Sequence, residues 1–238
     1  MPALIPCGNI PVQKIWHKSG RAARIGLPGP IDRRRQTVGL MGGSFNPAHD
    51  GHRHLALLAL HRLGLDEVWW LVAPQNPLKP KNGMAPFAER LASARRVARH
   101  PRLQPSDIEA RLGTRYTADT LQALQRRFPT RRFVWIMGAD CLAEFTRWKD
   151  WQHIFRMMPV AVFDRPSYSL RALWSLAARR FARVRVKSGS ARGLAHRQPP
   201  AWVFLHTRLH PASATQIRGD ANQDRYSAGK PLGQESGG

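Results

Sequence analysis

The chain carries, at residues 37–63, the sequence TVGLMGGSFNPAHDGHRHLALLALHRL. Its first five residues, Thr37 to Met41, are mostly apolar and predict a short buried strand, while the stretch from about His52 to Leu63 predicts a helix. The segment between them is rich in Gly, Asn and Pro, which favour loops. A strand, a loop and a helix are therefore expected to open the folded domain.

The same alternation continues along the chain. Further apolar runs lie at 68–73, 133–137, 160–163 and 202–205, and further helices are predicted at about 86–100, 117–128, 142–155 and 170–181. Continuous apolar strands separated by amphipathic helices indicate a sheet covered on both faces, because parallel strands need crossover connections. We predict an α/β fold with a doubly wound, mainly parallel sheet. The loops after Met41, Ala73 and Met137 are expected to meet at one site, beyond the carboxyl ends of the strands.

The 238 residues suffice for one sizeable α/β domain. We place that domain at residues 37–219. Residues 1–36 hold several Pro and Gly, a basic cluster and no sustained periodicity, so we expect a disordered arm. Residues 220–238 are polar and Gly-rich, and a flexible tail is expected there.

The composition limits the class of protein. The apolar runs fall short of the ~20 residues that span a bilayer, so we expect a soluble protein that does not bind membranes. The two cysteines, Cys7 and Cys141, lie far apart without close partners, which favours a reducing, cytoplasmic compartment. The formal net charge of +23 attracts phosphate-rich partners of any kind and names none of them.

The loop after the first strand has the chemistry of a phosphate cradle. Gly42 and Gly43 allow main-chain amides to approach an anion closely. His49 and His52 follow, the second at the start of a predicted helix whose amino end adds partial positive charge. Their imidazoles can donate hydrogen bonds to triphosphate oxygens and to charge that develops during transfer. The alternative is that one or both histidines cap or pack the helix.

A second candidate for anion binding is SATQIR at residues 213–218. Ser213 and Thr215 place hydroxyls where a helix would begin, and Arg218 follows one turn later. The two hydroxyls could equally be helix caps, and Arg218 could be one more surface arginine.

Together these stretches resemble a known family. GGSFNPAHDGH at 42–52 resembles the phosphate loop of the nucleotidyltransferase superfamily with the His-x-Gly-His motif, and SATQIR resembles its C-terminal Ser/Thr-x-x-Arg element. The resemblance runs from about Val38 to Arg218 and is most similar to the bacterial nicotinate-nucleotide adenylyltransferases. Four more stretches support that family: APQNPLK at 73–79, YTADTL at 116–121, GAD at 138–140, and Trp148.

The resemblance implies a Rossmann-like nucleotidyltransferase fold and a reaction. AMP passes from ATP to nicotinate mononucleotide, giving nicotinate adenine dinucleotide and pyrophosphate in NAD biosynthesis. The implied cofactor is Mg²⁺ bound with ATP, without a metal site made by protein side chains. The implied partners are these two substrates, no specific nucleic acid is expected, and a homo-oligomer is left open.

The resemblance also assigns residues. The catalytic set is His49, His52 and Arg218. The ATP-binding set is Gly42, Gly43, Ser44, Phe45, His49, His52, Gly138, Asp140, Ser213, Thr215 and Arg218, and the mononucleotide-binding set is Ser44, Lys79, Thr117 and Trp148. Trp148 offers a π face to the pyridine ring, Thr117 offers donors to the nicotinate carboxylate, and Asp140 can accept from ribose or adenine.

Two positions depart from the family pattern, and two other functions stay open. Asn46 stands where Asp is common, and we expect its carbonyl to anchor the loop equally well. Lys149 follows Trp148 where an aromatic residue is frequent. The acceptor could instead be nicotinamide mononucleotide or phosphopantetheine. The high positive charge would also suit a non-catalytic nucleic-acid-binding protein on the same fold.

Overall fold

The computed structural model describes residues 36–75, 83–165 and 168–207. Within these ranges seven strands form one sheet in the order β3-β2-β1-β4-β5-β7-β6, and every pairing is parallel. The strands are β1 Thr37–Gly43, β2 Glu67–Val72, β3 Leu103–Ser106, β4 Arg132–Gly138, β5 Val160–Phe163, β6 Arg185–Val186 and β7 Trp202–Leu205. The predicted parallel α/β architecture is confirmed.

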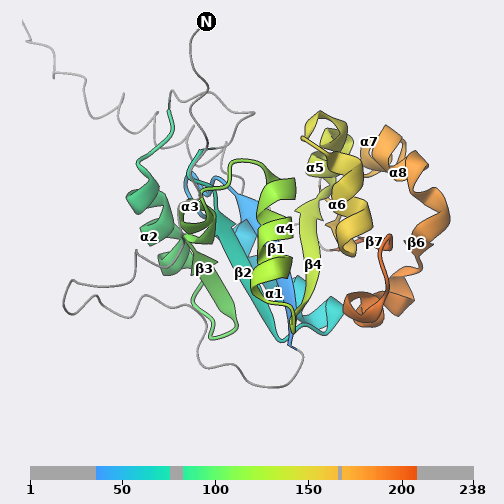
Figure 1. Ribbon diagram of the computed structural model, residues 1–238, viewed down its shortest axis with the longest axis horizontal. Coiled ribbons are helices and arrows are strands. Elements are labelled where there is room, and N and C mark those ends of the chain that lie inside the picture. The colour runs from blue at the N-terminus through green and yellow to red at the C-terminus, as the bar shows by residue number, and fades with distance from the viewer. Residues whose placement is uncertain (1–35, 76–82, 166–167, 208–238) are drawn as a thin grey trace, which may run out of the picture. The chain divides into compact units, whose positions relative to one another are not determined.

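Helices cover both faces of the sheet, and Figure 1 shows α4 crossing in front of it. One face carries α1 Asp50–Leu63, α2 Phe87–Val97 and the 3₁₀ segment η4 Ser188–His196. The other face carries α3 Ile108–Leu112, α4 Thr117–Arg127, α5 Ala139–Ala143, η2 Phe145–Arg147, α6 Trp151–Met157, α7 Ser169–Leu173 and α8 Leu176–Arg180. The short segment η3 Ala182–Val184 leads into β6.

The central strand β1 is buried on both sides. Val38 and Leu40 point into one hydrophobic cluster and Met41 into the other. Leu40 lies opposite Trp69 of β2 and Trp135 of β4. Such two-sided burial explains why this strand reads as a continuous apolar run instead of an alternating one.

Two predicted boundaries of the opening unit shift. Gly42 and Gly43 belong to β1 and pair with Leu71 and Val72 of β2, so they are strand residues and not the start of the loop. The helix begins at Asp50, two residues earlier than expected. The loop that carries the motif is correspondingly shorter, from Ser44 to His49.

The helix predicted at 142–155 is wrong as a single element. It is divided into α5, η2 and α6, because Trp148 has an extended backbone and Asp150 a left-handed one, with φ of 52°. The helix predicted at 170–181 is also divided. Ser175 begins a new helix there, since its hydroxyl accepts a hydrogen bond from the amide of Ala178 at 3.2 Å.

Five short elements were not predicted: β3, α3, η3, β6 and η4. Strand β3 contains Pro105, which a sheet tolerates at an edge, and β3 is an edge strand. Strand β6 has two residues and forms the opposite edge. Neither contains an apolar run from which a strand could be predicted.

Apart from Gln36, the predicted arm (residues 1–36) and the predicted tail (residues 220–238) lie outside the described part of the chain, so both remain predictions. None of the helices in the described ranges has the length and apolar character needed to cross a bilayer.

Burial moves the titration of one carboxyl group into the neutral pH range. Glu109 of α3 is 8% exposed, and desolvation raises its pKa from 4.5 to about 7. The folded state therefore holds a proton that the unfolded state has already lost between these pH values. The stabilisation from this carboxyl is complete below pH 4.5 and is lost as the pH rises through 7.

We expect Glu109→Gln to flatten the pH dependence of stability. At pH 8 the free energy of unfolding of the variant should exceed that of the parent by about 1–3 kcal/mol. At pH 5 the two values should agree. Urea unfolding across this pH range measures the difference. Glu89→Gln, at an exposed position, is the control. Parallel stability curves for the parent and Glu109→Gln would contradict the prediction.

Candidate active site

The candidate site lies at the centre of the sheet, where the strand order reverses. β1 is flanked by β2 and β4, and the chain leaves all three strands at the same edge. The amide of Ala73, just after β2, donates to the carbonyl of Gly43 at 3.0 Å, so the loops after β1 and β2 are joined. Open parallel sheets bind their ligands at this kind of switch point.

An aromatic stack positions the loop that follows β1. The ring of Phe45 is stacked on Trp70, with centroids 5.1 Å apart and an interplanar angle of 6°. His52 lies 4.9 Å from Phe45, and His49 lies 3.8 Å from His52. Phe45 is 2% exposed and adopts a φ of 48°. The two motif histidines are thus held against a rigid part of the core.

The histidines also begin α1. His49 is the N-cap residue of this 14-residue helix, and its amide donates to Nδ1 of His52 at 3.2 Å. A neutral His52 that accepts at Nδ1 carries its proton on Nε2, which can donate to an anion. The capping interpretation is therefore correct, since both histidines take part in a capping box, and it is compatible with a role in binding phosphate at the positive end of the helix.

Ser44 adds a polar group without a protein partner. The residue is 6% exposed, and its hydroxyl oxygen makes no hydrogen bond within the described residues. An unpaired buried hydroxyl costs free energy that a bound ligand can recover. Phosphate oxygens are suitable acceptors for this hydroxyl.

Gly42 has a packing role that the sequence did not reveal. A Cβ atom at Gly42 would lie 2.6 Å from the indole of Trp135, so a side chain there would displace the ring. Trp135 in turn meets the edge of Trp148, with centroids 6.2 Å apart. Gly42 therefore allows β4 to support the candidate pyridine-binding residue. At Gly43 a Cβ would lie 3.3 Å from the ring of Phe45.

Trp148 and Thr117 come from different elements that one lysine links. Trp148 is half-buried and packs on Phe145 at 4.9 Å, while Thr117 is the first residue of α4. Lys149 Nζ lies 3.2 Å from Asp119 Oδ2 and 4.9 Å from the ring centroid of Tyr116. The unusual lysine thus ties the segment of Trp148 to the start of α4.

Gly138 and Asp140 lie at the carboxyl end of β4, together with a residue that sequence reasoning missed. Arg165 follows β5, and its Nε lies 3.3 Å from Oδ1 of Asp140. A Cβ at Gly138 would come within 2.6 Å of the same Nε, so a side chain there would displace this ion pair. The position of Arg165, two residues beyond the end of a parallel strand, was the signal that could have identified it.

Asn46 anchors the loop in two ways. Its Oδ1 accepts from the amide of Ala85 at 3.1 Å, which confirms the expected role of the side-chain carbonyl. Its Nδ2 also donates to the carbonyl of Gly83 at 2.8 Å. An aspartate could make the first of these bonds but not the second.

Four of the predicted site residues cannot be placed. Lys79, Ser213, Thr215 and Arg218 lie outside the described residues. Their assignments therefore rest on the sequence alone.

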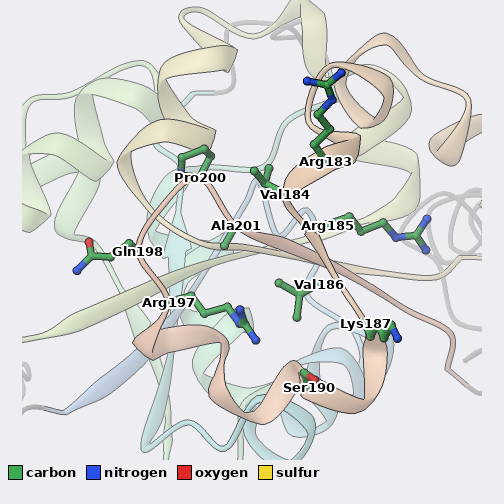
Figure 2. A pocket seen from close by; sticks show the side chains of 10 residues that line it. All are labelled: Arg183, Val184, Arg185, Val186, Lys187, Ser190, Arg197, Gln198, Pro200 and Ala201. Carbon is green, nitrogen blue, oxygen red and sulfur yellow. The ribbon is translucent and has the colours of Figure 1, made fainter.

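A hollow of about 650 Å³ at the β6 edge contains none of the predicted site residues. Arg183, Arg185, Lys187 and Arg197 are among its lining residues. Figure 2 shows the side chains of Arg183 and Arg185 pointing in different directions, away from the middle of the hollow. Arg185 instead stacks over Trp202, with 5.3 Å to the ring centroid. We therefore place the candidate site at the switch point and not here.

Known proteins match the same region of the chain. The sequence profile of the cytidylyltransferase-like family matches residues 40–220. A probable nicotinate-nucleotide adenylyltransferase of Cereibacter sphaeroides is 57% identical over 181 residues, covering 76% of this chain and 96% of the relative. A relative with the same description from Bradyrhizobium is 55% identical over 181 residues, covering 76% of this chain and 94% of the relative.

Solved structures support the fold. The Plasmodium falciparum nicotinic acid mononucleotide adenylyltransferase complexed with NaAD aligns with a TM-score of 0.59 at 13% identity, covering 80% of this chain and 89% of that one. At this identity the likeness concerns the fold, whereas the family follows from the sequence matches. The chain belongs to the cytidylyltransferase-like family and, within it, to the nicotinate-nucleotide adenylyltransferases.

Proposed function

We propose that this nicotinate-nucleotide adenylyltransferase transfers AMP from ATP to nicotinate mononucleotide at the switch-point site, with residues of the Ser44–His49 loop and the first turn of α1 binding the triphosphate. The observation that carries this proposal is the pair of histidine rings 3.8 Å apart at the amino end of α1. The two imidazoles lie at a helix terminus and the buried hydroxyl of Ser44 belongs to the same loop, and all of these groups can bind phosphate oxygens.

On the ATP side, the donors neutralise charge as pyrophosphate leaves. Nε2 of His52 and the hydroxyl of Ser44 donate to phosphate oxygens, and His49 holds the ring of His52 in place. The phosphate of the acceptor attacks the α-phosphorus directly, so no enzyme nucleophile is needed. Catalysis then depends on positioning of the two substrates and on electrostatic stabilisation of the transition state. Cys141 packs against the core beside this site, in agreement with a structural role. Ser213, Thr215 and Arg218 are assigned to the same phosphates by their sequence motif.

On the acceptor side, Trp148 stacks on the pyridine ring. Its indole is half-buried and rests on Phe145 and Trp135, so it presents a flat surface at low entropic cost. Thr117, at the start of α4, donates to the nicotinate carboxylate. Lys79 is assigned to the mononucleotide by its sequence motif. Asp140 accepts from the ribose or the adenine amino group of ATP.

Magnesium is proposed to enter with ATP. Mg²⁺ is commonly held by substrate phosphates with few protein ligands, and the donors at this site suit the phosphates themselves. The ion would add positive charge beside the leaving pyrophosphate. We further propose a cytoplasmic location, because the two cysteines lie far apart in the sequence and do not indicate a disulfide framework.

The proposed function is tested by the choice of acceptor. Purified protein with ATP and Mg²⁺ is offered nicotinate mononucleotide, nicotinamide mononucleotide and phosphopantetheine in parallel, and pyrophosphate release is measured. We expect the highest kcat/KM with nicotinate mononucleotide. Higher activity with either other acceptor would reassign the acceptor, and release with none from folded protein would refute the transfer reaction.

Replacement of the motif histidines tests the phosphate site. His52→Ala and His49→Asn should each lower kcat by about 10²-fold, because they remove or misplace a donor to the transition state. Asparagine at position 49 keeps the capability to cap α1. His61→Ala, an exposed histidine on the same helix, is the matched control. Normal kcat in His52→Ala would exclude His52 from the chemistry.

Replacement of Trp148 tests the acceptor pocket. Trp148→Ala should raise KM for nicotinate mononucleotide by about tenfold, the equivalent of an aromatic stacking interaction, with little change in KM for ATP. Trp174→Ala is the control, since Trp174 is 76% exposed. An equal rise in both KM values, or a rise for ATP alone, would contradict the assignment.

A further inference from the structure

The structure buries one positive charge that no motif identified. Arg90 lies on α2 and is 2% exposed. Within the described residues its guanidinium donates to neutral main-chain carbonyls: Nη1 to Ser44 and Ala73 at 2.7 Å each, Nη2 to Pro74 at 2.6 Å, and Nε to Ala85 at 2.9 Å. Burial lowers the pKa of this guanidinium. A buried charge is costly unless its hydrogen bonds are satisfied, and here carbonyls accept from four of the five N–H groups.

These carbonyls lie on the two loops that form the candidate site. Ser44 follows β1, whereas Ala73 and Pro74 follow β2. One nitrogen, Nη1, therefore holds the ends of two neighbouring strands at fixed separation. The bonds are as short as charge-assisted hydrogen bonds usually are. Asn46 adds a second connection from the same loop to Gly83 and Ala85.

The bond to Ser44 also determines the direction of an amide. The carbonyl of Ser44 and the N–H of Phe45 belong to one planar trans peptide group, so they point in opposite directions. With the carbonyl held by Arg90, the N–H of Phe45 is turned away from α2. Phe45 has a φ of 48°, a left-handed conformation that is unfavourable for a residue with a side chain. The hydrogen bond from Arg90 helps to maintain this conformation.

We propose that Arg90 is a positioning residue for adenylyl transfer. It orients the Ser44–Phe45 peptide group so that the amide of Phe45 binds a phosphate of ATP. It also fixes the loop after β2 relative to this peptide group. This inference rests on the proposed function, because it assumes that the loop binds a nucleotide. A lysine has no planar fork of donors and cannot span four carbonyls. Displacement of a positioned group by about 1 Å can cost 10²-fold in rate.

The test compares Arg90→Lys with Arg95→Lys, an exposed arginine on the same helix. Both are assayed at a temperature at which circular dichroism shows them folded. Arg90→Lys should lower kcat by about 10²-fold, with KM for nicotinate mononucleotide changed less than threefold. Arg95→Lys should match the parent. A kcat for Arg90→Lys within threefold of the parent would overturn the proposal.

A local measurement separates orientation of the loop from general stability. Hydrogen exchange of the amides in residues 42–48 should be faster in Arg90→Lys than in Arg95→Lys, while exchange in β5 stays equal in the two variants. Equal exchange at 42–48 would overturn the proposal even if activity falls.

A second measurement uses only the parent protein, in case Arg90→Lys does not fold. A non-hydrolysable ATP analogue should slow exchange of the Phe45 amide, and lack of protection at saturating analogue would overturn the proposal. This readout needs no acceptor. If protection is seen but no acceptor supports turnover, the transfer reaction fails while binding of a nucleotide phosphate by the Phe45 amide stands.

Discussion

Parallel pairing of β1 with both β2 and β4 is the constraint on which the rest of the structure depends. It requires crossover helices on both faces, which makes β1 buried on two sides. Bulky neighbours then leave little room beside it. A Cβ at Gly39 would lie 2.5 Å from Ile136, and one at Gly42 would lie 2.6 Å from Trp135. The glycines of β1 are thus needed for sheet packing as well as for the loop that follows.

The same pairing brings the carboxyl ends of β1, β2 and β4 to one edge of the sheet. The candidate site there consists mainly of hydrogen-bond donors. Nε2 of His52, the amino end of α1 and the hydroxyl of Ser44 can all bind anionic oxygens. Arg165 and Asp140 pair at the next strand end. Such a site is suited to transfer between phosphates, which depends on positioning and on neutralising the charge of the leaving group.

Support for this site comes from the core behind it. Trp70, Phe45 and His52 form one stack, and Trp135 links Gly42 to Trp148. The loop proposed for the nucleotide side is therefore supported by Trp70 of β2, and the residue proposed for the acceptor side by Trp135 of β4, on opposite faces of the sheet. Lys149, a departure from the family pattern, connects the acceptor side to Asp119 and Tyr116 instead of leaving it open. Asn46 likewise makes a bond that the common aspartate could not make.

The sequence by itself determined the parallel α/β fold, the five strands formed by apolar runs and the histidine motif, because each depends on residues close together in the chain. Apolar runs specify buried strands, and the spacing of His49 and His52 puts both at the start of one helix. It did not determine where helices break. Trp148 and Asp150 leave helical conformation because Trp148 packs on Phe145 and Trp135, the latter on another element.

Only the tertiary structure decided the roles of Arg90, Arg165 and Gly42. Arg90 is 46 residues from Ser44 in sequence, and nothing local distinguishes it from the exposed arginines of the same helix. Its partners are main-chain carbonyls, which every residue possesses and no sequence pattern records. A buried charge becomes a positioning device only once the fold has brought those carbonyls around it, and that arrangement is a property of the assembled sheet.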